Sequence, residues 1–238
     1  MTTLHITPER ARVLLAGINE FSGLSSADLE ELSKFCRWRH YAAEQEIVRY
    51  QDHTTDAFFL VQGRVRVMHY SSSGHEVILC DLSAGEMFGE LTAIDGLVRS
   101  ALVVAKADSI AASISASDFL NLLQSNPQVS LTILKRLTEQ VRRLTDRVYD
   151  FSTLSVPDRI HVELLRLAKT HPAVTNMGVI SPAPTDTDMA NFLSTHREAV
   201  NRELNKLARE GLIAKEGHEL HILNMAELRR MIQEARGC

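Results

Sequence analysis

Residues 88–101 have the sequence FGELTAIDGLVRSA and lie between two runs rich in strand-forming residues. Within this stretch, an acidic residue, Glu90, opens a short helical segment, and Arg99 and Ser100 follow it. A guanidinium binds phosphate oxygens with a planar fork of N–H donors, whereas a carboxylate accepts from a hydroxyl or an amine. Gly89 allows close backbone approach, and free N–H groups at a helix start suit an anion. The stretch therefore predicts a sugar-phosphate site, although Glu90 and Arg99 alone also fit a surface ion pair.

The sequence around this stretch has the pattern of short antiparallel strands. The chain from about residue 46 to about residue 113 has the runs FFLVQGRVRVMHY, EVILCDL and ALVVAKADSIAASI, which are typical of half-buried strands. Gly63, Gly74 and Gly85 separate these runs at intervals of 11 residues, as turn residues would. An amphipathic helical stretch precedes them at residues 28–36. We therefore predict an α+β fold whose N-terminal part is an antiparallel β-roll.

Residues 88–101, called the cassette below, resemble the phosphate-binding cassette of the cyclic nucleotide-binding fold. The FGEL opening, the RSA closing and the three upstream glycines all match that family. The resemblance implies that Glu90 binds the ribose 2′-hydroxyl and that Arg99 and Ser100 bind the cyclic phosphate. It also implies backbone contacts or close packing from Gly89, Leu91 and Ala101.

A long helix is predicted from about residue 127 to residue 154. Its apolar residues recur with spacings of 3, 4, 3, 4 and 3, and densely charged flanks leave a narrow apolar stripe. Such a stripe favours pairing with the same helix of a second copy, although a core-facing helix of one domain has the same spacing. The residues of this predicted dimer seam are Leu134, Leu137, Val141, Leu144, Val148 and Phe151.

The same resemblance places two residues of the long helix over the purine. The spacing is similar to that of the cyclic AMP receptor proteins and puts Leu144 and Thr145 at the purine-contacting positions. Those proteins have a Thr-Ser pair there, so this chain keeps one hydroxyl of the two. A site rejects an analogue strongly only when polar groups are left unpaired. We therefore expect cyclic AMP to bind, with cyclic GMP as a second ligand.

Residues 185–207 have the pattern of two short helices joined by a tight turn. Thr185 with Asp188 resembles a capping box at the start of the first helix, and Ser194 with Thr195 makes the turn. On the second helix, Ala199, Val200, Leu204 and Leu207 can face a core. The opposite face is polar, which fits either a solvated helix or a helix that reads DNA.

The chemistry at the start of the second helix favours DNA. Arginine reads guanine O6 and N7, and glutamate accepts from cytosine N4, at the end that helix-turn-helix proteins place in the major groove. The segment resembles the recognition helix of the Crp/Fnr family, whose R-E-x-x-x-R pattern maps onto Arg197, Glu198 and Arg202. The resemblance implies binding to an inverted repeat of TGTGA-type half-sites. The predicted DNA-contacting residues are Thr185, His196, Arg197, Glu198, Asn201, Arg202 and Lys206.

The remaining segments complete a three-part prediction. Pro157 fits the first turn of a helix that runs to about residue 169, and a polar segment at 171–184 follows it. Residues 211–222 look like the wing of a winged-helix protein, and Asn224 caps a final helix. We predict a β-roll at residues 1–125, a dimerisation helix and hinge at 126–154, and a winged helix-turn-helix at 155–238.

Composition agrees with a cytosolic DNA-binding regulator and argues against an enzyme. The net charge is −4, but the acidic excess lies in residues 1–150, which carry 15 Lys/Arg and 19 Asp/Glu, so a local basic face is still possible. The three cysteines and ten histidines have no metal-ligand spacing, so we expect no metal. We find no apolar run that would span a membrane, and no nucleophile with a base.

The expected partners are double-stranded DNA, a second copy of the chain and RNA polymerase. One alternative keeps this fold but gives it a different effector, such as haem, 2-oxoglutarate or a cyclic dinucleotide, or none. Another alternative is an enzyme or a regulatory subunit of one, for which the two modules leave no catalytic domain.

Overall fold

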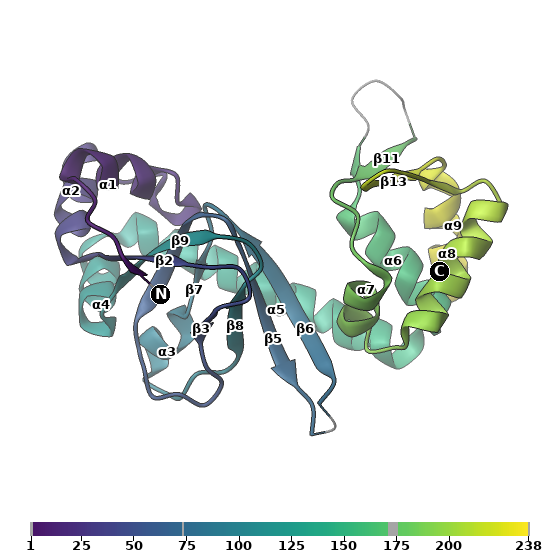
Figure 1. Cartoon of the computed structure of the whole chain (residues 1–238), viewed down its shortest axis with the longest axis horizontal. Helices are drawn as coiled ribbons and strands as arrows, with labels where there is room; N and C mark the ends of the chain where they lie inside the picture. Colours follow the sequence, from purple (N-terminus) through teal and green to yellow (C-terminus); the bar gives the residue numbers. More distant parts are fainter. Residues whose placement is uncertain (1, 73, 171–175, 238) are drawn as a thin grey trace. The chain divides into compact units, whose positions relative to one another are not determined.

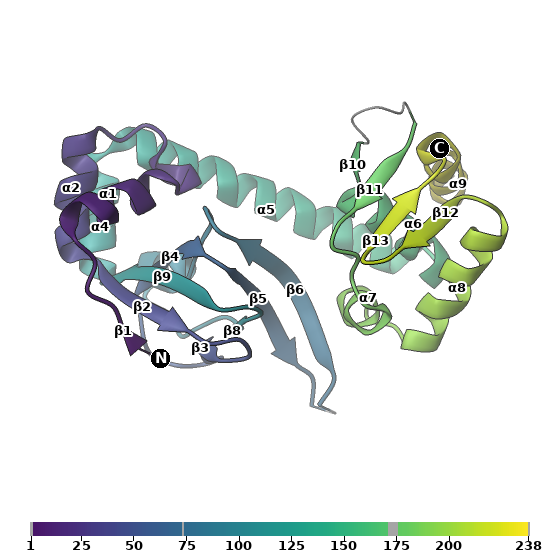
Figure 2. The ribbon, with the colours of Figure 1, turned by 45° about the horizontal axis from the view of Figure 1, so that its top comes forward.

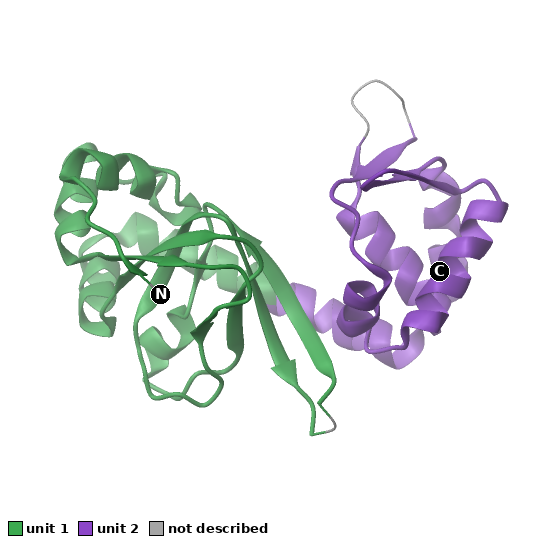
Figure 3. Cartoon of the chain, viewed as in Figure 1, with its two compact units in different colours: residues 1–140 green, residues 141–238 purple. Residues whose placement is uncertain are grey.

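The computed structural model describes residues 2–72, 74–170 and 176–237. The chain divides into two compact units, Met1–Gln140 and Val141–Cys238 (Figure 3). The long helix α5, Pro127–Thr153, contributes its first part to one unit and its last turns to the other. Among the described helices, none has the length and apolarity needed to cross a membrane.

The first unit is built on two antiparallel sheets, with strand orders β1-β2-β9-β4-β7 and β3-β8-β5-β6 (Figures 1 and 2). Apolar side chains from both sheets, among them Phe58, Leu60, Val65, Leu82 and Val103, meet in one buried cluster. The predicted antiparallel roll within an α+β fold is therefore confirmed. The strands are β1 (Thr2–Thr3), β2 (Arg37–Tyr41), β3 (Glu46–Val48), β4 (Ala57–Gln62), β5 (Arg64–Tyr70), β6 (Glu76–Ser83), β7 (Met87–Phe88), β8 (Leu102–Ala105) and β9 (Ser109–Ile114).

Helices cover the first of these sheets. They are α1 (Pro8–Ala16), the 3-10 turn η1 (Asn19–Phe21), α2 (Ser26–Phe35), α4 (Ala116–Ser125) and the start of α5, whose apolar residues join those of the sheet in a second cluster. Within it, the rings of Phe21 and Phe59 meet edge to face with centroids 4.7 Å apart. Helix α2 begins where Ser25 and Asp28 cap each other in a capping box, so it starts two residues before the amphipathic stretch predicted at 28–36. The roll thus has a helical layer on one side.

The predicted turn glycines all have left-handed backbone angles. The φ angles of Gly63, Gly74 and Gly85 are 90°, 80° and 97°. At Gly63 a Cβ atom would lie 2.3 Å from the hydroxyl oxygen of Ser109, so no other residue fits without displacement. The interval of 11 residues therefore marked real strand boundaries.

The second unit is a helix-turn-helix with a four-stranded sheet, in the order β10-β11-β13-β12 (Figures 1 and 2). Its helices are α6 (Val156–Leu167), α7 (Asp186–Leu193), α8 (Arg197–Arg209) and α9 (Met225–Arg236). Its core includes Ile160, Leu164, Val200, Leu207, Ile222 and Leu228. Strands β12 (Ile213–Glu216) and β13 (Glu219–Ile222) form the predicted wing and turn at Gly217, which has a φ of 58°.

One strand replaces the predicted end of a helix near residue 169, and a second lies where the sequence suggested only a polar connection. They are β10 (Lys169–Thr170) and β11 (Gly178–Ile180), and β11 pairs with β13 through Val179 opposite His221. Ile180 is 3% exposed, so the strand forms because it can bury an apolar residue against the wing. Residues 171–175 of the predicted polar segment lie outside the described residues.

The predicted dimer seam on α5 divides into two sets. Four of its residues are exposed, by 60% at Leu134, 63% at Val141, 46% at Leu144 and 67% at Val148. The other two are used within the chain, because Leu137 packs against the core of the first unit and Phe151 packs against arginines. The exposed set leaves an apolar stripe that the described chain does not cover.

Candidate nucleotide and DNA sites

The cassette forms a tight loop between strands β7 and β8. Gly89 has a φ of 76° and caps the short helix α3 (Glu90–Asp95), which ends at Gly96 with a φ of 71°. A Cβ atom on Gly89 would lie 2.8 Å from Nη1 of Arg99 and 3.0 Å from the carbonyl oxygen of Asp56. Glycine is thus required here both by its backbone angle and by the arginine that approaches it.

Arg99, near the end of the cassette, is buried, with only 1% of its surface exposed. Its Nε donates to Thr54 Oγ1 at 3.2 Å, Nη1 donates to the Gly89 carbonyl at 3.0 Å, and Nη2 donates to the Asp56 carbonyl at 2.7 Å. The guanidinium carbon also lies 5.6 Å from the ring centroid of Phe58. These bonds use only part of the donor capacity of the guanidinium.

The charge of Arg99 is not paired with a carboxylate of any described residue. All of its hydrogen-bond acceptors are neutral, and none of the described carboxylates forms an ion pair with it. Burial lowers the pKa of Arg99, while Asp56, Asp52 and Glu90 oppose that shift from a distance. A buried cation without a hydrogen-bonded counter-charge is costly, so this position favours an anion.

Glu90 is also buried, at 4% exposure, and pairs with a residue from the long helix. Arg136 of α5 donates from Nη1 to Glu90 at 3.1 Å and from Nη2 to the carbonyl of Met87 at 2.6 Å. The same arginine lies 3.3 Å from Glu20, which is 3% exposed. Glu90 and Arg99 are therefore not the surface ion pair that their charges alone allowed, because each is buried with its own partners.

Glu20 is the unusual member of this cluster. Burial raises the pKa of Glu20, while its backbone hydrogen bond and Arg136 oppose the shift, and its second carboxylate oxygen has no hydrogen-bond partner. Two carboxylates thus share one guanidinium beneath the cassette. Glu20, Arg136, Thr54 and Asp56 were not predicted from the sequence as members of this site, because each lies far along the chain from the residues that it contacts.

The other predicted nucleotide-binding residues differ in exposure. Ser100 is exposed, Ala101 is 7% exposed and Leu91 is 39% exposed. Leu144 and Thr145 are exposed on the part of α5 that belongs to the second unit, and Thr145 donates to the carbonyl of Val141 at 3.0 Å. The structure brings Gly89, Glu90 and Arg99 together, and the contact of Leu144 and Thr145 with a purine stays a prediction.

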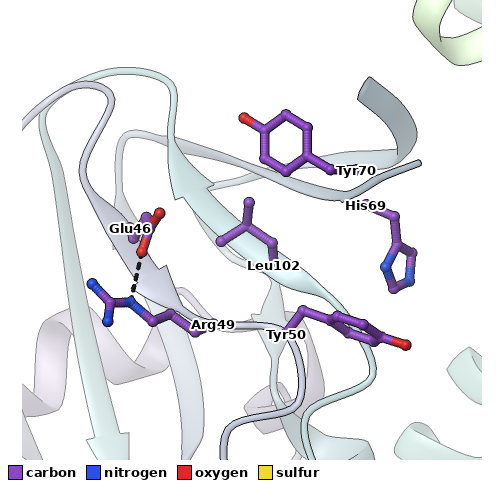
Figure 4. A pocket seen from close by; sticks show the side chains of 6 residues that line it. All are labelled: Glu46, Arg49, Tyr50, His69, Tyr70 and Leu102. Atoms are coloured by element: carbon purple, nitrogen blue, oxygen red, sulfur yellow. Dashed lines mark hydrogen bonds and ion pairs between the residues drawn. The ribbon is translucent and has the colours of Figure 1, made fainter. Parts of the chain in front are cut away.

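A separate shallow pocket of about 290 Å³ lies on the other sheet of the roll (Figure 4). The rings of Tyr50 and His69 meet edge to face at 4.7 Å, and Arg49 pairs with Glu46 at 2.8 Å. No cassette residue lines this pocket, so it is distinct from the predicted nucleotide site. Its lining residues are Glu46, Arg49, Tyr50, His69, Tyr70 and Leu102.

Helices α7 and α8 form the predicted helix-turn-helix. Thr185 caps α7 by accepting from the backbone N–H of Asp188 at 3.0 Å, and Ser194 makes the turn with a φ of 49°. His196 caps α8 without a side-chain hydrogen bond, and Val200 and Leu207 are fully buried beneath it. The second helix is therefore fixed against the core by its apolar face.

The polar face of α8 is open at its N-terminal end. Arg197, Glu198 and Arg202 are exposed, and none of their side chains bonds to another described residue. Asn201 donates to Asp186 at 3.0 Å, which ties α8 to the start of α7. Lys206 lies 3.7 Å from Glu203. Apart from Thr185, which caps α7, the predicted DNA-contacting residues lie on α8 or at its N-cap, and the side chains of the three with base-reading chemistry bond to no other described residue.

Comparison with known proteins supports both halves of this description. A family model described as a cyclic nucleotide-binding domain matches residues 38–126, and one described as a Crp-like helix-turn-helix domain matches residues 158–231. The cAMP-activated global transcriptional regulator Vfr of Pseudomonas aeruginosa is 29% identical over 193 residues, covering 79% of this chain and 90% of its own length. The cAMP-activated global transcriptional regulator CRP of Pasteurella multocida is 29% identical over 190 residues, covering 79% and 91%.

Solved structures show the same fold. FixK2 from Bradyrhizobium japonicum superposes with a TM-score of 0.68 at 20% identity, covering 82% of this chain and 96% of its own. A mutant of CooA from Carboxydothermus hydrogenoformans gives a TM-score of 0.74 at 19% identity, covering 84% and 88%. With a cyclic nucleotide-binding domain followed by a Crp-like helix-turn-helix domain, the chain belongs to the Crp/Fnr family of transcription regulators.

Proposed function

We propose that the chain is a cyclic nucleotide-dependent transcription regulator that binds cyclic AMP, with cyclic GMP as a second ligand. The observation that carries this proposal is the buried, carboxylate-free guanidinium of Arg99 beside Gly89. A phosphate at the cassette would supply the missing negative charge, and the exposed hydroxyl of Ser100 would donate to it. Glu90, held by Arg136, would accept from the ribose 2′-hydroxyl.

Base selectivity would depend on the long helix. We assign Leu144 and Thr145 to the purine, with Thr145 as the only hydroxyl of the pair. Because Thr145 bonds to its own helix carbonyl, it would have to exchange that bond for one to the base. One hydroxyl distinguishes adenine from guanine weakly, which is why both nucleotides are proposed.

The output would be DNA binding by a homodimer in the cytoplasm. Arg197, Glu198 and Arg202 would read each TGTGA-like half-site in the major groove, and Thr185, His196, Asn201 and Lys206 would support them. The exposed stripe of Leu134, Val141, Leu144 and Val148 would pair with the same stripe of a second copy. RNA polymerase would be a further partner of the DNA-bound dimer.

Calorimetry with each nucleotide tests the effector directly. We expect cyclic AMP to bind the wild-type protein and Arg99→Gln to weaken it by at least about 100-fold, because a charge-assisted contact to phosphate is lost. Arg49→Gln is the matched control, since Arg49 is exposed on the same unit outside the cassette. A wild-type protein that takes up neither nucleotide would refute the proposal.

A second candidate is the same regulator with a different effector or none. The observation that favours it is the burial of Arg99, whose three acceptors already hold the guanidinium in place. In that case the protein would bind a TGTGA palindrome equally well with and without either nucleotide in a gel-shift titration. An increase in operator affinity on adding cyclic AMP would exclude this candidate.

A further inference from the structure

The last turns of α5 are part of the DNA-binding unit. That unit begins at Val141, so residues 141–153 of the helix belong to it. Asp150 and Leu154 are each 7% exposed, whereas Val148 on the opposite face is 67% exposed. Ser155 then caps α6 by accepting from the N–H of Asp158. The end of α5 is thus buried on one side against the helices that follow it.

Arg147 makes the central contact of this buried side. Its guanidinium carbon lies 4.4 Å from the ring centroid of Phe192 and 5.3 Å from that of Phe151. Its Nη2 also donates to the carbonyl of Phe192 at 2.6 Å. Phe192 is in α7, just before the turn residue Ser194 that leads into α8. Arg147 therefore holds the helix-turn-helix at the point where its chain reverses.

Two further arginines cover the same rings from α6. Arg159 lies 4.5 Å from the Phe151 centroid, and Arg166 lies 5.1 Å from the Phe192 centroid. Burial lowers the pKa of Arg159, whose buried Nε has no hydrogen-bond partner. Arg166 pairs with Glu163, with its Nε 2.7 Å from a carboxylate oxygen. Three cations around two half-buried rings make a cation–π cluster that joins α5, α6 and α7.

The C-terminal helix, α9, also contacts the last turns of α5. Arg236, in the last turn of α9, donates to Asp150 at 2.6 Å. Asp150 is one residue before Phe151, so this ion pair and the aromatic cluster fix the same helical turn. We call Arg147, Asp150, Phe151, Phe192 and Arg236 the clamp.

We propose that the clamp makes residues 147–153 of α5 one rigid body with α7 and α8, so that the junction at residues 154–155 is not a hinge. Arg147 and Phe192 are then positioning residues for the recognition helix. This inference rests on the proposed function, in which a change at α5 must reach α8. A movement of the last turns of α5 would be transmitted without loss, because no loose segment intervenes.

Hydrogen exchange of the full-length protein tests the rigid body without reference to any effector. In the wild-type protein we expect amides 147–154 to exchange as slowly as those of α6. Arg147→Met keeps the apolar stem but removes the cation, and it should speed exchange of this segment and of α7 by about tenfold. Arg143→Met is the matched control, since Arg143 is exposed on the same helix and has no partner among the described residues.

A conservative substitution at Arg147 distinguishes a positioning role of this residue from a general effect on helix stability. Arg147→Lys keeps a cation near the rings and should retain part of the slow exchange, which a general loss of helix stability would not allow. Fast exchange of residues 147–154 in the wild-type protein, or equal exchange in Arg147→Met and Arg143→Met, would overturn the rigid body.

Operator titrations test what the clamp transmits. With Arg147→Met we expect an unchanged dissociation constant for cyclic AMP, since Arg147 contacts Phe192 of α7 and is not among the residues assigned to the nucleotide, but a stimulation of operator binding reduced by about tenfold. Full stimulation in this variant would overturn the transmission. If the wild-type protein shows no stimulation at all, the proposed function fails, while the exchange measurement still decides the clamp.

Discussion

Glu20 illustrates how a single residue beneath the cassette acts on stability. It is a buried carboxylate with a raised pKa and an oxygen that has no hydrogen-bond partner. A folded-state pKa above the unfolded value means that the folded protein binds this proton more tightly. The contribution of Glu20 to folding is therefore most favourable at low pH and is lost as the pH rises through the folded pKa.

Replacing Glu20 by Gln removes this dependence on pH. We expect Glu20→Gln to be the more stable protein at neutral pH, because Arg136 keeps Glu90 as its partner and a second buried carboxylate no longer has to share that guanidinium. Below pH 4.5, the ordinary pKa of a glutamate side chain, the difference should vanish, since the wild-type residue is then protonated as well. Urea unfolding of the wild-type protein and of Glu20→Gln, at several pH values between acid and neutral, measures this difference in the free energy of unfolding. A variant that is less stable than wild type at neutral pH would contradict the assigned cause.

At this scale the sequence predicted the cassette residues but not their partners. Glu90 and Arg99 stand in a local pattern, so their place at one loop was predictable from spacing and residue type, whereas their burial was not. Thr54 is 45 positions from Arg99, and Arg136 is 46 positions from Glu90. Such pairs are set by the strand order of the roll and the path of α5, which local patterns do not contain. The sequence neighbours of Thr54 and Arg136 also form no motif of their own.

At the scale of elements, helix ends were the most predictable feature. Thr185 and Asn224 each accept the backbone N–H that their capping patterns predict. The apolar seam of α5 was predicted as one surface, yet Leu137 and Phe151 face other parts of the chain. Periodicity reports that a helix has an apolar face, and it does not say which partner covers each turn.

The turn between α7 and α8 gives a prediction at the same scale. Ser194 adopts a left-handed conformation, which costs a residue with a Cβ atom about 1 kcal/mol or more and costs glycine almost nothing. We expect Ser194→Gly to raise the free energy of unfolding by about 0.5 kcal/mol, after the larger entropy of glycine in the unfolded chain is subtracted. Ser194→Val should lower it by at least about 1 kcal/mol. Thermal unfolding of the wild-type protein and the two variants measures these differences in stability. A Ser194→Gly variant that is less stable than wild type would contradict the expected backbone strain at this turn.

For the whole molecule, the sequence predicted two modules joined by a helix, and the structure shows where the compact units divide. The division falls at Gln140, inside α5, whereas the helical pattern runs unbroken across it. Burial decides the division, because the helix packs on the roll through Val129 and Ile133 and on the DNA-binding unit through Asp150. The apolar spacing of α5 continues through residue 140, so the sequence does not show where the helix stops packing on one unit and begins to pack on the other.

The assembly itself is tested by charging the exposed stripe. Val141→Glu combined with Val148→Glu would place like charges along the proposed seam, and both positions are more than half exposed, so each chain should still fold. We expect a monomer by analytical ultracentrifugation, and operator affinity reduced by at least about 100-fold because the half-sites are no longer bound together. Arg143→Glu is the control, since it adds the same charge beside the seam. A double variant that stays dimeric would place the interface on another surface, and the two recognition helices would then have to be spaced by contacts outside α5.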